Sequence, residues 1–488
     1  MRARHIEGHP LFTRRKFINL GTAALAIATS RARLRAQETS ATLTATLTVD
    51  PTIQLATLQP DFTGLSYESA QLANPLFFSA KNKELVALFL QLSPRGVLRL
   101  GGGTSEFTTF SETTPPGPPP FEIFGPDTSK TDKQGTVTSA FALENLRGFL
   151  DATGWSCLYG LNLGQGTKEN AVAEAAAVHR ILGPRLVALQ IGNEPDSFRN
   201  RYRPQSYGPE DFIREWNEFH DAVIARTQGL KFAGPDISNK LSFLTAFAVE
   251  TVKHPDVILL TGHYYAMGPV GRPEATLDNL LSADPKLTTL KWRDIPVIED
   301  AMRSANLPFR ISEANSCWNG GQAGVSDVFG SALWCADMML HFAALGFSGV
   351  NLHGGGNGIY SPIIGSPSNG FTRRPEFFGM QFAQRFAGAT LLRTTLKCES
   401  DRVTTYAART SRASNGVDQL AIINKTAARV EIRLGAELIR GRRFHIWSLK
   451  GPSRQAQSDI QFVEEKSLVV RQGLLSVEPY CAILLNLK

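Results

Sequence analysis

The sequence predicts an α/β protein, a (β/α)8 TIM barrel plus a C-terminal β-sandwich. Eight short apolar runs alternate with longer helix-like stretches through the middle of the chain. After about residue 386, brief strand-like segments separated by turns replace this alternation. The chain has 488 residues, of which 42% are hydrophobic and 19% charged, so it is long and apolar enough for a barrel with an accessory domain.

The barrel is predicted from a strand followed by a helix, repeated eight times. The runs are short and apolar, as expected for strands that are covered on both faces. The expected strands are 62–67, 97–100, 157–163, 186–191, 232–233, 257–261, 309–311 and 350–352. The expected helices include 83–92, 140–152, 169–181, 209–226, 241–253 and 327–345.

The β-sandwich is predicted from seven short segments with turn residues between them. These segments are 394–398, 403–408, 420–423, 430–434, 444–447, 467–470 and 480–487. Residues 41–49 alternate small or apolar residues with threonine, and we expect this half-buried strand to join the C-terminal sheet. The predicted domains are therefore 37–56 for the N-terminal strand, 57–385 for the catalytic barrel and 386–488 for the β-sandwich.

The first 36 residues predict an export signal. They hold eight Arg or Lys residues against one acidic residue, so they account for the whole net charge of +7. Arg14-Arg15-Lys16-Phe17 precedes an apolar run over 20–28, well below the ~20 residues that span a bilayer. This order resembles a twin-arginine signal, so we expect a periplasmic or extracellular protein. The alternative is an uncleaved basic tail.

The rest of the chain is neutral overall, which gives no electrostatic reason to expect a nucleic acid or a membrane as partner. Five scattered cysteines form no CxxC motif, and nine histidines show no metal-ligand spacing. We therefore expect no disulfide framework, no metal site and no cofactor.

Two glutamates directly follow predicted strands, at the end where barrel active sites lie. Glu194 follows the fourth run in the sequence GNEPDSF, and Glu313 follows the seventh in the sequence SEAN. A carboxylate at a buried rim is costly unless it is used or paired. One protonated and one ionised carboxyl form the acid/base and nucleophile of a retaining glycosidase, which needs them ~5–5.5 Å apart. The alternative is that both glutamates serve in structural salt bridges.

The ordered set of motifs resembles glycoside hydrolase family 79, the clan A family of heparanases and β-glucuronidases. The motifs are LRLGGGT at 98–104, GNEPDSF at 192–198, GHYY at 262–265, the glycine-bearing loop after Glu313, and GGGNGIY at 354–360. They are spread over the whole predicted barrel, and Asn-Glu-Pro with a later Glu is the clan A pattern. The resemblance implies that Glu194 is the acid/base and Glu313 the nucleophile.

The resemblance also implies contacts with the sugar. Asn193 is expected to hold the 2-hydroxyl group, and Tyr265 to orient the nucleophile through a hydrogen bond. Tyr360 and the backbone N–H groups of Gly320 and Gly321 are expected to bind the C6 carboxylate, since a carboxylate accepts several fixed donors.

Further candidates lie near the expected mouth of the barrel, and three of them have two interpretations each. Glu68 follows the first strand and is expected to bind ring hydroxyls, unless it is a solvated loop charge. Thr104 and Ser105 are weaker candidates for substrate binding. Arg99 either pairs with a carboxylate near the site or anchors the barrel floor, and His263 is either functional or a satisfied core histidine.

The charge balance favours an exo-acting enzyme, because an enzyme that cuts inside heparan chains should present clustered Lys and Arg. The one tight basic cluster, 440–443, belongs to the predicted β domain. We expect a retaining exo-β-glucuronidase that removes terminal glucuronic acid, with or without a 4-O-methyl group, from carbohydrates or glycoconjugates. The alternatives are an endo-acting heparanase-like enzyme, another clan A exo-glycosidase and a non-catalytic glycan-binding protein.

Overall fold

The computed structural model describes residues 42–114, 135–282, 294–354, 358–410, 416–439, 444–465 and 473–487. The predicted export signal, 1–36, lies outside the described residues, as do the predicted strand 467–470 and the basic cluster 440–443. None of the described helices is both long and apolar enough to cross a bilayer.

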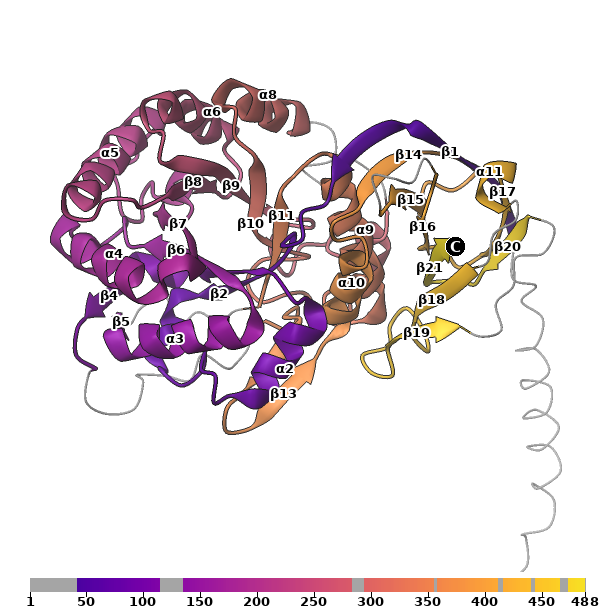
Figure 1. The fold of residues 1–488 in the computed structure, drawn as a ribbon, viewed down its shortest axis with the longest axis horizontal. Helices are drawn as coiled ribbons and strands as arrows, with labels where there is room; N and C mark the ends of the chain where they lie inside the picture. The colour runs from indigo at the N-terminus through magenta and orange to yellow at the C-terminus, as the bar shows by residue number, and fades with distance from the viewer. Residues whose placement is uncertain are drawn as a thin grey trace, which may run out of the picture. The chain divides into compact units, whose positions relative to one another are not determined.

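Eight parallel strands close into a barrel in the order β10-β11-β2-β3-β6-β7-β8-β9, which confirms the predicted barrel fold (Figure 1). Each of the eight predicted runs overlaps one of these strands. Their bounds are β2 (Thr63–Glu68), β3 (Val97–Gly101), β6 (Ser156–Leu161), β7 (Leu186–Ile191), β8 (Phe232–Ile237), β9 (Val257–Tyr265), β10 (Phe309–Asn315) and β11 (Gly349–His353).

Helices surround the barrel, and local sequence explains where they begin and end. In α3, the Ser139 hydroxyl accepts a hydrogen bond from the Ala142 backbone N–H (3.2 Å), and Gly154 ends the helix at φ 77°. The longer helices are α2 (Lys83–Leu92), α3 (Ala140–Thr153), α4 (Lys168–Leu182), α5 (Pro209–Arg226), α6 (Leu241–Glu250), α8 (Ile295–Ala305), α9 (Phe329–Ala344) and α10 (Pro375–Gln384). The shorter ones are α7 (Leu277–Leu280), α11 (Ala436–Ile439), η1 (Ser69–Ala73), η2 (Gly103–Phe107), η4 (Gly183–Arg185), η5 (Pro195–Ser197) and η6 (Thr251–Lys253).

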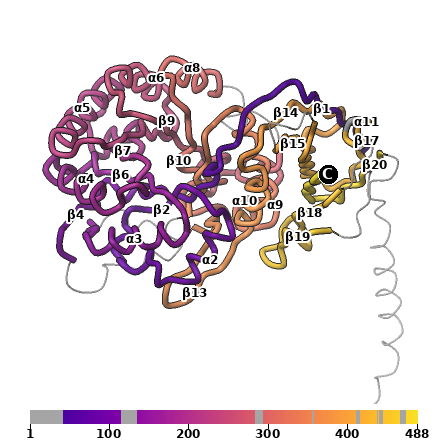
Figure 2. The backbone as a smooth tube through the Cα atoms, in the orientation of Figure 1, coloured from indigo at the N-terminus to yellow at the C-terminus, as the bar shows by residue number. Residues whose placement is uncertain are grey.

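The all-β domain is one continuous nine-stranded sheet in the order β19-β18-β21-β16-β15-β14-β1-β17-β20. The N-terminal strand β1 (Thr42–Thr57) pairs antiparallel with β14 (Thr390–Cys398), and Figure 2 shows these two segments, indigo and orange, side by side. Buried hydrophobic residues from strands along the sheet, from β1 to β21, pack into one cluster, which forms the core of this domain. Its other strands are β15 (Val403–Arg409), β16 (Gln419–Asn424), β17 (Arg429–Leu434), β18 (Phe444–Lys450), β19 (Gln461–Glu465), β20 (Leu474–Val477) and β21 (Cys481–Leu487).

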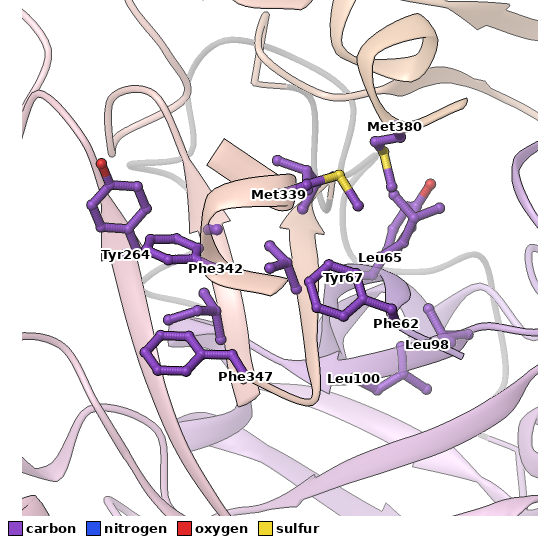
Figure 3. Packing of buried hydrophobic residues seen from close by; sticks show 14 of the residues in the cluster. Phe62, Leu65, Tyr67, Leu98, Leu100, Tyr264, Met339, Phe342, Phe347 and Met380 are labelled. Carbon is purple, nitrogen blue, oxygen red and sulfur yellow. The ribbon is translucent and has the colours of Figure 1, made fainter. Parts of the chain in front are cut away.

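Helix α9 is buried along almost its whole length because it lies between the barrel and the sheet domain. On the barrel side, Phe342 contacts Tyr264 of β9, with ring centroids 5.1 Å apart (Figure 3). On the other side, Asp337 accepts hydrogen bonds from the Tyr406 hydroxyl (2.6 Å) and the Thr404 hydroxyl (2.7 Å) of β15. The sheet domain therefore packs on α9, which in turn packs against β9 and β11 of the barrel.

Two short pairs of strands lie in the segments that follow β3 and β11 of the barrel. β4 (Thr108–Ser111) pairs in parallel with β5 (Thr136–Ser139), and β12 (Ile363–Ser366) pairs antiparallel with β13 (Gly370–Arg373). Each pair follows a barrel strand, so both belong to the connections at the carboxyl ends of the strands.

Candidate active site

The structure brings Glu194 and Glu313 to one mouth of the barrel. Glu194 lies just beyond β7, and Glu313 lies in β10. Nδ1 of His263 is 2.9 Å from Oε1 of Glu194 and 4.0 Å from Oε1 of Glu313. These two carboxylate oxygens are therefore at most about 7 Å apart, the sum of the two distances. This limit accommodates the ~5–5.5 Å carboxyl separation of retaining glycosidases.

The backbone of Glu194 adopts a left-handed conformation, with φ 50° and ψ 52°. Such a conformation is uncommon for a residue with a side chain and is concentrated at functional sites. The Glu194 backbone N–H donates to the carbonyl oxygen of Asp236 (2.9 Å), and Pro195 begins η5 immediately afterwards. The chain is thus held by β8 at the point where the carboxyl group enters the mouth.

Glu313 is held as a carboxylate. Its side chain is 9% exposed, and burial alone would raise its pKa, but His353, His263 and Arg99 outweigh that effect. Together with a hydrogen bond from the Tyr265 hydroxyl to Oε1 (2.6 Å), they lower the pKa to about 2. An ionised, oriented carboxylate is what a nucleophile requires.

Glu194 has the opposite shift. Burial raises its pKa, and the charge of Glu313 raises it further, while the hydrogen bond from His263 lowers it. Its side chain remains 31% exposed toward the mouth. Two carboxyl groups whose pKa values move apart in one site take the roles of proton donor and nucleophile.

Arg99 connects the nucleophile to the barrel interior. This residue of β3 is 1% exposed and donates to Glu313 Oε2 and Asp236 Oδ2, both at 2.5 Å. It also donates to the amide oxygen of Asn193 (2.6 Å) and to Ser66 Oγ (3.0 Å). Its planar fork spreads five N–H donors over three nitrogens, whereas a lysine offers three donors on a single nitrogen. Of the two interpretations from sequence, the structure places Arg99 beside the site carboxylates.

His263 also lies between carboxylates. Its Nε2 faces Asp236 Oδ2 at 3.3 Å, and its Nδ1 donates to Glu194. Burial lowers the pKa of His263, but the charges of Glu313 and Asp236 overcome this effect and raise it to about 10. The positive charge of the His263 imidazolium therefore lowers the pKa of both Glu194 and Glu313. Asp236 itself, buried but paired with Arg99 and His263, has a lowered pKa.

Asn193 is fixed on two sides. Its amide oxygen accepts from Arg99, which leaves the amide nitrogen as the donor for a ligand. Its backbone N–H donates to Glu106, a buried carboxyl of η2 that also accepts from the backbone N–H of Leu163 (3.1 Å) and of Gly164. Burial raises the pKa of Glu106 to about 7, against these backbone donors. Glu106 thus positions the loops after β6 and β7.

Tyr360 lies next to the Gly320-Gly321 turn. A Cβ built on Gly321 would be 3.0 Å from the Tyr360 ring, and the two glycines have φ of 88° and 95°. Side chains rarely adopt such values, which explains glycine here. Within the described part of the chain, the structure gives no hydrogen-bond partner to the backbone N–H groups of Gly320 and Gly321. They are available to an anion. The Tyr265 hydroxyl lies between Glu313 and Tyr360.

Glu68 faces the site through His353 rather than as a free loop charge. Its Oε1 is 3.5 Å from Nε2 of His353, and Nδ1 of His353 is 3.7 Å from Glu313 Oε2. Thr104 donates to Glu68 Oε2 from both its backbone N–H (2.8 Å) and its hydroxyl (2.6 Å). Ser105 donates to the Gly102 carbonyl (2.9 Å). Thr104 and Ser105 are each at most 2% exposed. Thr104 therefore lies behind Glu68 and positions it, whereas the Ser105 hydroxyl makes no hydrogen bond to Glu68.

Sequence reasoning did not single out Asp236, Glu106 or His353. Asp236 lies in Gly-Pro-Asp at the carboxyl end of the fifth barrel strand, β8, so its position near a strand end was a usable signal. His353 ends the eighth strand in the same way. Glu106 lies in a short 3-10 helix, and nothing local in its sequence marks it.

No protein-family model matches the chain. Among curated proteins, it is 24% identical over 320 residues to a β-glucuronidase of Neurospora crassa, a match covering 59% of this chain and 56% of that protein. It is 23% identical over 422 residues to a β-glucuronidase of Aspergillus niger, covering 78% and 73% respectively. A baicalin-β-D-glucuronidase of Scutellaria baicalensis is 26% identical over 235 residues, 46% of this chain and 42% of that one.

Solved structures share the fold. A 4-O-α-L-rhamnosyl-β-D-glucuronidase from Fusarium oxysporum superposes with a TM-score of 0.66 at 16% identity, covering 91% of this chain and all of that one. A family 51 arabinofuranosidase from Xanthomonas axonopodis gives 0.62 at 14% identity, with 91% of this chain and all of that one covered.

The barrel fold, with a carboxyl group at the ends of both β7 and β10, is one that these glycoside hydrolase structures share. The sequence relatives are β-glucuronidases, which confirms the resemblance to glycoside hydrolase family 79.

Proposed function

We propose that this chain is a retaining exo-β-glucuronidase that removes terminal β-linked glucuronic acid from glycans or glycoconjugates. The observation that carries the proposal is the opposite pKa shift of two carboxyl groups in one barrel mouth, raised for Glu194 and lowered for Glu313. The names of the sequence relatives support the choice of sugar.

In the first step, protonated Glu194 donates its proton to the glycosidic oxygen while the Glu313 carboxylate attacks the anomeric carbon. The bond from this carbon to the leaving oxygen breaks, the aglycone departs as an alcohol, and a glycosyl ester forms on Glu313. In the second step, Glu194 takes a proton from water, whose oxygen attacks the same carbon. Glucuronic acid leaves in the β configuration and the Glu313 carboxylate is restored.

Asn193 and Tyr265 align the sugar and the nucleophile. The hydrogen bond from Arg99 turns the Asn193 amide nitrogen outward, where it can donate to the 2-hydroxyl group. That contact strengthens as the oxocarbenium-like transition state develops. The Tyr265 hydroxyl holds one oxygen of Glu313 and Arg99 the other, so the attacking carboxylate needs little reorganisation.

The glucuronate carboxylate is proposed to bind the backbone N–H groups of Gly320 and Gly321 together with the Tyr360 hydroxyl. Fixed dipoles suit this task because they attract one anion without adding a cation beside the nucleophile. The neutral charge balance of the chain beyond its first 36 residues favours attack at a chain end over attack inside a sulfated polymer. For residues 1–36 we propose an export signal.

The test is the hydrolysis of aryl β-D-glucuronide, β-D-glucoside and β-D-xyloside, with the anomer of the first product followed by proton NMR. We expect turnover of the glucuronide alone, with β-glucuronic acid appearing first. Initial α-glucuronic acid contradicts the retaining mechanism, and preference for a neutral sugar favours another clan A exo-glycosidase. Release of internal oligosaccharides from a heparan chain favours the endo alternative, and absence of all turnover favours a glycan-binding protein.

A further inference from the structure

We propose a second site in this protein, for a divalent transition-metal ion, formed by His220, His254 and Asp256. One nitrogen of each imidazole and one oxygen of the carboxylate all lie within 4.8 Å of one another. Helix α5 supplies His220, and the turn between η6 and β9 supplies the other two residues. The spacing of these residues along the sequence matches no metal motif, so only the fold reveals the cluster.

His220 is oriented as a metal-binding histidine usually is. Its Nδ1 is 3.1 Å from a carboxylate oxygen of Asp221, and its Nε2 is 3.0 Å from Asp256 Oδ2. Ligating histidines commonly donate their second N–H to a carboxylate, which fixes the tautomer. In the tautomer with the proton on Nδ1, Asp221 accepts that proton, and Nε2 can bind an ion held between it and Asp256 Oδ2. The ring is 2% exposed and stacks on Trp216, with centroids 4.8 Å apart.

The cluster also contains buried polar atoms without partners. Among the described residues, His254 Nε2 and Asp256 Oδ1 are buried and receive no hydrogen bond. The carboxylate nearest to His254 Nε2, that of Glu250, is 3.6 Å away, which is too long for a hydrogen bond. Buried polar groups nearly always have partners, and a bound ion supplies one.

The donor set favours zinc. Two imidazoles and one carboxylate are typical zinc ligands, whereas calcium and magnesium take oxygen ligands. Tetrahedral Zn–N bonds of about 2.0–2.1 Å place ligand atoms about 3.3–3.4 Å apart, so closure needs a movement on the order of 1 Å. Water or Glu250 would complete the coordination.

This site lies at the amino end of β9, whereas His263 lies near its carboxyl end beside the catalytic pair. The ~3.3 Å rise per strand residue separates the two ends by roughly 20 Å. The ion would therefore clamp α5 to the turn before β9 and take no part in glycoside cleavage.

The experiment measures Zn²⁺ binding to the full chain by calorimetry after chelator treatment, and Co²⁺ binding by visible absorption. We expect one ion per chain and a higher Tm with Zn²⁺. His254→Gln should weaken binding more than 100-fold, and Asp221→Ala, which removes only the orienting carboxylate, ~10–100-fold. His445→Gln, which removes an exposed histidine of the sheet domain, should leave the affinity unchanged.

Absence of stoichiometric binding to the folded protein at micromolar Zn²⁺ overturns the proposal. Equal affinity of the wild type and His254→Gln also overturns it. Every variant keeps the histidines of residues 1–36, so equal affinity would mean that Zn²⁺ binds outside the proposed site. If His254→Gln does not fold, Asp256→Asn is the replacement and the same loss is expected. Hydrolysis of the aryl β-glucuronide should be unchanged in either variant, which separates this site from the proposed catalytic one.

Discussion

Replacing His263 with glutamine tests the electrostatics of the proposed mechanism most directly. The substitution removes a buried positive charge that lies 2.9 Å from Glu194 and 4.0 Å from Glu313. His263 is a positioning residue, since it acts on both carboxyl groups without reacting itself. Its loss should therefore move the pH dependence of the enzyme, and not merely its rate.

The size of the effect follows from the distances. Two unit charges 4.0 Å apart interact by about 4 kcal/mol at an effective dielectric constant of ~20. At 1.36 kcal/mol per pKa unit this corresponds to about 3 units for Glu313. Arg99 and His353 still face that carboxylate in the variant, so we expect its pKa to rise by ~1–3 units from about 2.

The expected pKa changes of Glu313 and Glu194 in the His263→Gln variant have the same sign. Glu313 works ionised, so a higher pKa moves the acid limb of kcat/KM to higher pH. Glu194 works protonated; burial raises its pKa and His263 lowers it, so losing His263 raises it further. The basic limb therefore also moves to higher pH. A purely structural loss would lower the rate at all pH values and leave both limbs in place.

The assay is kcat/KM for an aryl β-D-glucuronide across the full pH range, because this ratio reports the ionisations of the free enzyme. His445→Gln is the matched control, since it removes a histidine that is 48% exposed in the sheet domain. Circular dichroism at each pH shows whether the variant is folded. Limbs that stay in place, or move to lower pH, refute the proposed roles of Glu194 and Glu313.

Three further substitutions probe other parts of the site. Glu313→Ala should reduce turnover by ~10⁴–10⁶-fold, with azide restoring some activity and giving an α-glucuronyl azide by NMR; full activity contradicts the nucleophile assignment. Gly321→Ala places a methyl group 3.0 Å from the Tyr360 ring at φ 95°, so KM for glucuronides should rise more than kcat falls, and an unchanged KM argues against the carboxylate cradle. Arg99→Met removes the guanidinium that pairs with the two buried carboxylates of Glu313 and Asp236, and it should lower the free energy of unfolding by about 3–5 kcal/mol in urea titrations. A loss below ~1 kcal/mol would contradict this account of Arg99.

Much of the barrel could be predicted from sequence because its strands are short apolar runs that alternate with helix-like stretches. Helix α5, for example, begins at Pro209 and ends at Arg226 as predicted. The sheet domain was harder, since β19 and β20 have only five and four residues, and β19 carries the exposed polar residues Gln461 and Glu464. Segments this short have no clear pattern of their own, and pairing with β18 and β17 defines them.

The candidate site was predictable where function follows from position. Glu194 and Glu313 each stand at the end of a strand, and the topology of a closed barrel then brings them together. Side-chain direction was not predictable in the same way. Thr104 and Ser105 follow a strand too, yet their hydroxyls turn toward Glu68 and the Gly102 carbonyl. The local sequence does not predict the direction of these side chains, because the turn of the segment after β3 depends on contacts with Glu68 and with other parts of the chain.

The charges around the mouth explain why one site can serve both chemical steps. The Glu313 carboxylate faces Arg99 and His263, and its negative charge raises the pKa of Glu194. Formation of the glycosyl ester removes the charge of Glu313, while Arg99 and His263 remain in place. Loss of that negative charge lowers the pKa of Glu194 at the moment when it must accept a proton from water. The same cations that keep the nucleophile ionised in the first step thus convert the acid into a base for the second.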